Sequence, residues 1–272
     1  MLNTPPTRVR PPLFAFPESW YLLKTLTLSD LRSQHSGSVL GGVWFVVKPL
    51  VLIGIYTVVF SAAVDTLGGF QDRSMNYGLF IFAGMLPWLF IQESTQRGAT
   101  IMVDLAHVIR HHSLPMGLLP LHVVLAAALS QLIGMLVFLA IKWILTSHIS
   151  PYAALILIVI PVQIVFCFGL VLIVAIMNVF LRDTSHLTMT ALVVWFFSSP
   201  IVFPLDRFSG GVKALMWLNP MTGLTEIYRD LLLIGRLPSA LAVGSFSFFA
   251  VVVVLIGCGL YRKTHDAIVD WI

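Results

Sequence analysis

The sequence predicts an all-α polytopic membrane protein with six transmembrane helices, forming a single transmembrane domain over residues 1–272. Hydrophobic residues make up 58% of the chain and charged residues only 10%, whereas an ordinary soluble domain has roughly 25% charged residues. Several apolar runs are long enough to cross about 30 Å of hydrocarbon at about 1.5 Å per residue. Because a soluble protein of this size cannot bury so much apolar surface, the excess is expected to face lipid.

The N-terminal residues predict a flexible tail followed by an amphipathic helix at the membrane interface. Prolines break up residues 1–17, and no apolar core with a small-residue cleavage site follows, so no cleaved signal peptide is expected. Over residues 18–36, Trp20 and most of the leucines fall in one half of a helical wheel, while Lys24 and Arg32 fall in the other half. A helix with this pattern lies in the interface with its apolar side toward the acyl chains.

Six apolar segments predict the spans. The second span is expected to continue through Glu93 to about Val103, because a helix that stopped at Gln92 would be barely long enough to cross the membrane. Pro161 and Gly169 are expected to kink the long fourth span, which neighbouring helices can tolerate. The predicted spans cover residues 39–64, 76–103, 118–143, 152–181, 187–204 and 240–261.

Residues 205–238 are too polar for a simple crossing and too apolar for a free loop. They predict two short re-entrant helices, split at Asn219–Pro220, that enter the membrane from the outer side, where irregular backbone must be buried in protein or line a cavity. Most of the 16 lysines and arginines lie at or toward the side that holds both termini. This bias favours cytoplasmic termini.

The chain carries no signature of an enzyme or of a nucleic-acid-binding protein. It has no glycine-rich phosphate-binding loop, its positive charges are scattered, and its twelve acids lie mostly at helix ends or in loops. His107 and His111 are one helical turn apart, but no glutamate lies between them and no third ligand is evident, so no metal site is expected. Cys167 and Cys258 are interpreted as small buried hydrophobic residues rather than as disulfide or metal partners.

Two charged residues lie inside predicted spans. Lys48 and Glu93 are expected at a similar depth from the cytoplasmic ends of their helices, and charges at such a depth are usually paired or functional. One interpretation is that they pair, or that Lys48 contacts an anionic headgroup where a substrate enters. The other is that Lys48 extends to the membrane surface.

Aromatic residues cluster in the first and fifth predicted spans. Aromatic rings stack on sugar rings and can line a path for a glycan, although in a membrane protein they also face lipid or fill the core. The channel-lining candidates are Trp44, Phe45, Tyr56, Phe60, Trp195, Phe196 and Phe197.

Five motifs occur in the order found in one family of membrane proteins. They are SVLGGVWFVVKPL at residues 38–50, YGLFIFAGMLPWLF at 77–90, NVFLRD at 178–183, SPIVFPLD at 199–206 and LNPMTGLTEIYR at 218–229. Through them the chain resembles, from end to end, the membrane (permease) subunit of type-2 ABC exporters that move lipid-linked polysaccharides out of bacteria, especially the O-antigen exporters. It departs from that family at Gln34-His35 and at Lys48, near the expected lipid entry.

The resemblance implies a complex of two copies of this chain with two copies of a nucleotide-binding ATPase subunit, which would bind ATP and Mg, while this chain has no cofactor or catalytic site of its own. The lipid-linked polysaccharide would pass between the two copies. The substrate-entry candidates are Arg32, Lys48 and Glu93. The coupling candidates, within residues 104–115, are Asp104, His107, Arg110, His111 and Pro115. The outer-gate candidates are Pro200, Asn219, Pro220, Glu226 and Arg229.

The resulting functional prediction is a permease subunit of an ATP-driven exporter of an O-antigen-like polysaccharide in the bacterial inner membrane. A capsule or teichoic-acid exporter of the same family is an alternative, and so is an ATP-independent lipid transporter or scramblase, which would be expected to show broken helices in both halves. A membrane-embedded glycosyl- or lipid-modifying enzyme is disfavoured because the acids do not converge.

Overall fold

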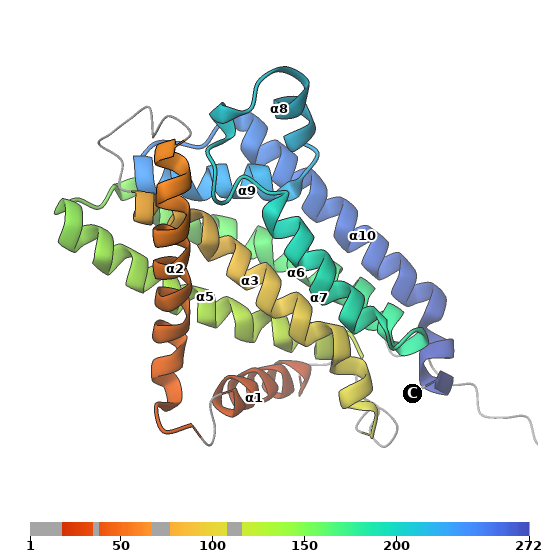
Figure 1. Ribbon diagram of the computed structural model, residues 1–272. Coiled ribbons are helices and arrows are strands. Elements are labelled where there is room, and N and C mark those ends of the chain that lie inside the picture. The colour runs from red at the N-terminus through yellow and green to blue at the C-terminus, as the bar shows by residue number, and fades with distance from the viewer. Residues whose placement is uncertain (1–17, 35–37, 67–76, 108–115, 272) are drawn as a thin grey trace, which may run out of the picture.

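The computed structural model describes residues 18–34, 38–66, 77–107 and 116–271, and these residues are helical apart from their connections. The predicted N-terminal tail and most of the predicted coupling segment lie outside them. In Figure 1, α1 and α8 lie at opposite ends of the molecule. The α-helices are α1 (Glu18–Ser33), α2 (Trp44–Thr66), α3 (Tyr77–Asp104), α5 (Leu118–Thr146), α6 (Ile156–Phe180), α7 (Thr184–Phe197), α8 (Gly210–Met216), α9 (Pro220–Tyr228) and α10 (Ala240–Trp271). A π-helical segment, Arg229–Ile234, continues α9, and short 3₁₀ turns cover Gly41–Val43, Pro151–Leu155 and Leu205–Arg207.

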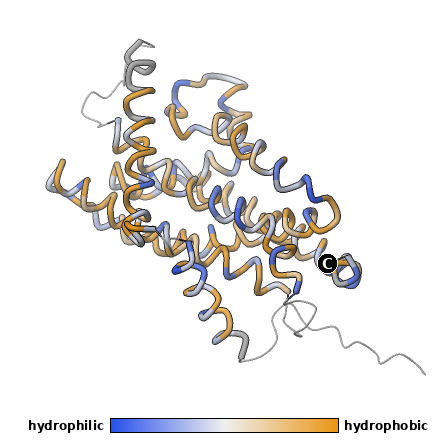
Figure 2. The backbone as a smooth tube through the Cα atoms, turned by 60° about the horizontal axis from the view of Figure 1, so that its bottom comes forward, coloured by the Kyte–Doolittle hydropathy of each residue, from blue (hydrophilic) through white to orange (hydrophobic). Residues whose placement is uncertain are grey.

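Three helical segments in the described part of the chain are long and apolar enough to cross a membrane: Leu118–Thr146, Pro151–Phe180 and Ala240–Ile268. Two further apolar segments, Gly41–Tyr56 and Thr184–Phe197, are shorter. Figure 2 shows hydrophobic residues along much of the long helices, and some of them, such as Ile158 and Leu255, are exposed. The all-helical prediction is confirmed, while the count of six crossings and the re-entrant depth of α8 and α9 stay predictions.

One of two predicted helix ends agrees with the structure and the other does not. As predicted, α3 continues past Gln92, and it ends at Asp104. In contrast, α7 ends at Phe197, short of the predicted end at residue 204, because the chain turns through Ser198 and Ser199 into Pro200, which has no N–H for a further helical bond.

The last helix continues beyond the predicted end of its span at residue 261. α10 runs to Trp271, whose ring lies 5.8 Å from that of Phe180. Ile268 is fully buried in a cluster that also contains Met102 and Met116, which lie on either side of the predicted coupling segment. The C-terminal residues therefore form part of the packed structure.

Two glycines allow α6 and α10 to approach closely. A Cβ atom on Gly169 would lie 2.6 Å from the Cα of Val254, and one on Gly257 would lie 2.8 Å from the carbonyl oxygen of Gly169. Real Cβ atoms do not approach backbone atoms so closely. Small residues at such a crossing let two membrane helices pack backbone against backbone.

This packing predicts different effects for two glycines of α10. Gly257→Ala should destabilise the protein by about 1–3 kcal/mol, as overpacking does, and lower its melting temperature in detergent. Gly259 is the matched control, because a Cβ atom added there would have no neighbour within 4 Å. Gly259→Ala should be neutral or should stabilise the helix by up to about 1 kcal/mol. Equal melting temperatures for the two variants would contradict the close crossing.

Candidate functional site

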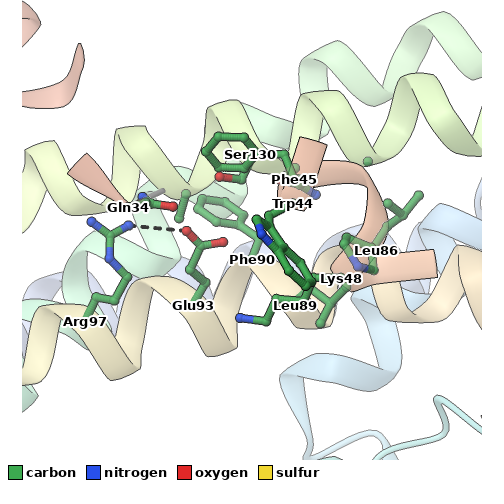
Figure 3. A pocket seen from close by; sticks show the side chains of 14 residues that line it. Gln34, Trp44, Phe45, Lys48, Leu86, Leu89, Phe90, Glu93, Arg97 and Ser130 are labelled. Carbon is green, nitrogen blue, oxygen red and sulfur yellow. Dashed lines mark hydrogen bonds and ion pairs between the residues drawn. The ribbon is translucent and has the colours of Figure 1, made fainter. Parts of the chain in front are cut away.

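A pocket of about 260 Å³ lies where the end of α1 and the start of α2 meet α3 and α5. We call it the α2–α3 pocket. Figure 3 shows its charged and aromatic side chains side by side. Its polar lining residues are Gln34, Lys48, Glu93, Arg97, Ser130 and Gln131, and its apolar wall includes Trp44, Phe45, Pro49, Leu86, Leu89 and Phe90.

An ion-pair cluster fixes one wall of the pocket. Arg97 Nη1 donates to Glu93 Oε1 at 3.2 Å, and Arg97 Nη2 donates to Asp30 Oδ2, so one guanidinium joins α1 to α3. Lys48 lines the same pocket as Glu93, but within the described residues no direct ion pair joins the two, and the interpretation in which they pair stays a prediction. Arg97 lies one helical turn from Glu93 on the same helix, a spacing at which opposite charges meet readily.

Residues from two predicted groups, the channel-lining candidates and the substrate-entry candidates, lie together at this pocket. Trp44 and Phe45, predicted to line a channel, lie beside Lys48 and Glu93, predicted to mark substrate entry. Arg32, the third entry candidate, is exposed on α1 and does not line the pocket.

The remaining aromatic candidates are divided between core and surface. Phe196 is buried and packs against Tyr56, with ring centroids 5.2 Å apart. Trp195 is half-buried against Trp88, whereas Phe197 is 65% exposed. The side chain of Phe60 lies outside the described part of the structure. On this protomer, Phe197 therefore offers the most open aromatic surface of α7.

Sequence reasoning missed a polar network inside the helix bundle. Gln131 Nε2 donates to Gln163 Oε1 at 3.1 Å and also to the hydroxyl of Tyr228, and that hydroxyl donates to Gln163 Oε1 at 2.7 Å. Gln163 Nε2 donates to the carbonyl oxygen of Pro87 at 3.0 Å. The network joins α3, α5, α6 and α9, and Gln131 also lines the pocket. Two glutamines within otherwise apolar runs were the available signal.

The outer-gate candidates gather where α7 ends and α9 begins. Asn219 Oδ1 accepts from Trp195 Nε1 at 2.8 Å and from the backbone N–H of Met221 at 3.0 Å, which caps α9. Asn219 Nδ2 donates to Ser199 Oγ at 2.9 Å. Pro220 occupies the first turn of α9, where its missing N–H breaks no helical hydrogen bond. The chain therefore begins a new helix at Asn219–Pro220, the predicted division between α8 and α9.

Arg229 makes the second connection at this corner. Its side chain is only 3% exposed, and Nη2 donates to the carbonyl oxygen of Ile201 at 2.6 Å. Its guanidinium also lies 3.4 Å from Glu226 Oε1 and 3.6 Å from the centre of the Phe80 ring, within cation–π distance. Pro200 is buried beside Ile201. Asn219 and Arg229 thus tie α7 and the segment after it to α9, and Arg229 also contacts α3.

A second buried cation holds the π-helical segment that follows α9, and its burial was not predicted. Lys142 of α5 is 5% exposed, and Nζ donates to the carbonyl oxygens of Leu232 at 2.6 Å and Leu233 at 3.1 Å. These carbonyl groups lie at the carboxyl end of the π-helical segment, where a positive charge is favourable.

Two of the coupling candidates are described. Asp104 and His107 are exposed at the end of α3, whereas Arg110, His111 and Pro115 lie outside the described residues. In the part of the chain that the structure describes, no group of three or more His, Cys, Asp or Glu side chains is placed to hold a metal ion.

Comparison with known proteins assigns the chain to a family. It is 25% identical over 247 residues to the O-antigen export system permease protein RfbA of Myxococcus xanthus, covering 90% of this chain and 93% of that relative. Identity to the RfbA of Klebsiella pneumoniae is also 25%, over 244 residues, with 89% and 91% covered. The polysialic acid transport protein KpsM of Escherichia coli is 20% identical over 255 residues, with 90% and 94% covered. The family model of the ABC-2 type transporters matches residues 21–233, and the chain belongs to this family of membrane transport proteins.

Proposed function

We propose that this chain is the permease subunit of an ATP-driven exporter that moves a lipid-linked, O-antigen-like polysaccharide across the bacterial inner membrane. The observation that carries the proposal is similarity to O-antigen export permeases over about nine-tenths of both chains. ATP and Mg bind a separate ATPase subunit, so this chain supplies the path and no catalytic residue.

The path lies between two copies of this chain, along α2 and α7. Both helices leave apolar side chains open on the protomer, including Val51 and Ile55 on α2 and Val194 and Phe197 on α7. Such surfaces face lipid or another apolar surface. A second copy placed against them encloses a path that a glycan can follow past aromatic rings.

The corner around Asn219 and Arg229 forms the outer seal of this path. Alternating access requires contacts that differ between closed and open states. The hydrogen bonds from Asn219 and Arg229 to residues between α7 and α9 are candidates for contacts that exist only in the closed state. The residues around Asp104 dock in the ATPase at the opposite end.

A capsule polysaccharide is the second candidate cargo. The relative named for polysialic acid transport is similar over the same share of the chain, although at lower identity. Both cargoes fit the same mechanism, and export assays with each lipid-linked polymer distinguish them.

The subunit prediction is tested by co-expressing this chain with an ABC ATPase encoded beside it and purifying through a tag on this chain alone. We expect two copies of each subunit, and ATP hydrolysis that is lost when residues 104–115 are replaced by a glycine-serine linker of equal length. The same replacement of residues 67–75 is the control and should retain hydrolysis. A chain that purifies alone and moves lipid without ATP would favour the scramblase alternative.

The gate prediction is tested by Asn219→Ala, which removes the acceptor of Trp195 and the cap of α9. The resting complex in liposomes should become leaky to small ions, and export should fall. Asn178→Ala is the matched control, because Asn178 Oδ1 accepts from the backbone of Ser185 near the start of α7, away from the corner. Unchanged ion flux and export in Asn219→Ala would refute the outer-seal assignment.

A further inference from the structure

We propose that the α2–α3 pocket binds a single sugar ring of the cargo, the ring next to the lipid phosphate, and that Gln131 and Glu93 select it through its hydroxyl groups. This inference rests on the proposed function, because it names the part of a lipid-linked glycan that the pocket receives. It adds a specificity site at the start of α2, one of the two helices along which the proposed path runs.

The size of the pocket limits which part of the cargo it can hold. Its volume of about 260 Å³ lies just below the roughly 300–1,000 Å³ of pockets that enclose drug-sized ligands. One ring with its substituents fits such a space, and a polymer does not. The pocket is therefore sized to hold one ring of the cargo at a time.

The charges of the pocket argue against a bare phosphate as its occupant. Arg97 is already paired with two carboxylates, those of Asp30 and Glu93. Lys48 is the other cation of the lining. Asp30 lies outside the lining but pairs with Arg97, so the cluster as a whole holds two cations and two carboxylates. Glu93 is a hydrogen-bond acceptor that repels an anion but accepts from a hydroxyl group.

Two buried polar atoms of the lining residues have no hydrogen-bond partner within the described residues. They are Oε1 of Gln131, a side chain that is 5% exposed, and Nε2 of Gln34. One is an acceptor and the other a donor, and leaving them unpaired in a buried position is unfavourable. A sugar hydroxyl both donates and accepts, so it can pair with an unsatisfied donor or acceptor in the lining, whereas a phosphate dianion only accepts.

An aromatic wall completes the site. Trp44 is 38% exposed, and its Nε1 donates to Ser38 Oγ at 2.8 Å, which fixes the orientation of the indole. In Figure 3 the Glu93 side chain lies between Arg97 and Trp44. A flat apolar face beside a carboxylate and amides offers stacking to the C–H face of a sugar and hydrogen bonds to its edge.

The test compares two probes on the complete complex with its ATPase in lipid nanodiscs. The probes are farnesyl phosphate and farnesyl phosphoryl glucose, which differ by one sugar. The glucose probe should bind the wild-type complex about tenfold or more tightly, as expected for added hydrogen bonds to a carboxylate. Equal affinities would overturn the proposal and identify the pocket as a site for the lipid phosphate alone.

Substitutions in the pocket test which residues produce the preference for the glucose probe. Gln131→Leu and Glu93→Gln should each lower the preference for the glucose probe by at least about fivefold. Gln163→Leu is the matched control, because it breaks the same buried network as Gln131→Leu but does not alter the pocket lining, and it should retain the preference. If Gln131→Leu does not fold, the partly exposed Glu93 still provides the decisive comparison. A preference that survives in Glu93→Gln would also overturn the proposal.

Failure of this inference and failure of the proposed function give different results. A complex that hydrolyses ATP and exports polymer but does not distinguish the two probes refutes only the sugar site. A chain that forms no complex with any ATPase refutes the proposed function, whichever probe the pocket binds.

Discussion

Polar groups buried among apolar side chains need partners, and this constraint organises the structure. In a chain dominated by hydrophobic residues, irregular backbone is tolerated only where its carbonyl and N–H groups are satisfied. Two buried cations do this for two segments, Arg229 at Ile201 and Lys142 at the end of the π-helical segment. Gln163 adds a bond to the carbonyl oxygen of Pro87 within α3. Each joins segments that are far apart in the sequence, so the bonds that satisfy the backbone also hold the helices together.

Much of the fold follows from the sequence because hydrophobicity is a local property. Apolar runs and their interruptions predicted α5, α6 and α10, the extension of α3 beyond Gln92, and the division of α8 from α9 at Asn219–Pro220. The end of α7 and the extension of α10 to Trp271 depend on turn geometry and on burial of Ile268 against distant helices. Those contacts leave no periodic signal in the sequence.

The sequence indicated several residues of the candidate site, but not which of them bind one another. Charge inside an apolar run identified Lys48 and Glu93, and both line one pocket. Which cation meets the carboxylate depends on helix rotation, and the i,i+4 neighbour Arg97 is closer than a lysine on another helix. Gln131 was overlooked because a lone glutamine in a span is uncharged, and its importance appears only when Tyr228 and Gln163 are brought beside it.

The continuity of α10 has a mechanical consequence. Its 32 residues give a rod of about 48 Å at about 1.5 Å per residue, which packs beside α9 at one end and enters the cluster of Met102 and Met116 at the other. Because a hydrogen-bonded helix resists shortening, a displacement of α9 would tilt α10 rather than compress it. The two ends of the molecule, the corner at α9 and the cluster of Met102 and Met116, are thereby connected through one continuous helix, which contacts α6 closely at its glycines.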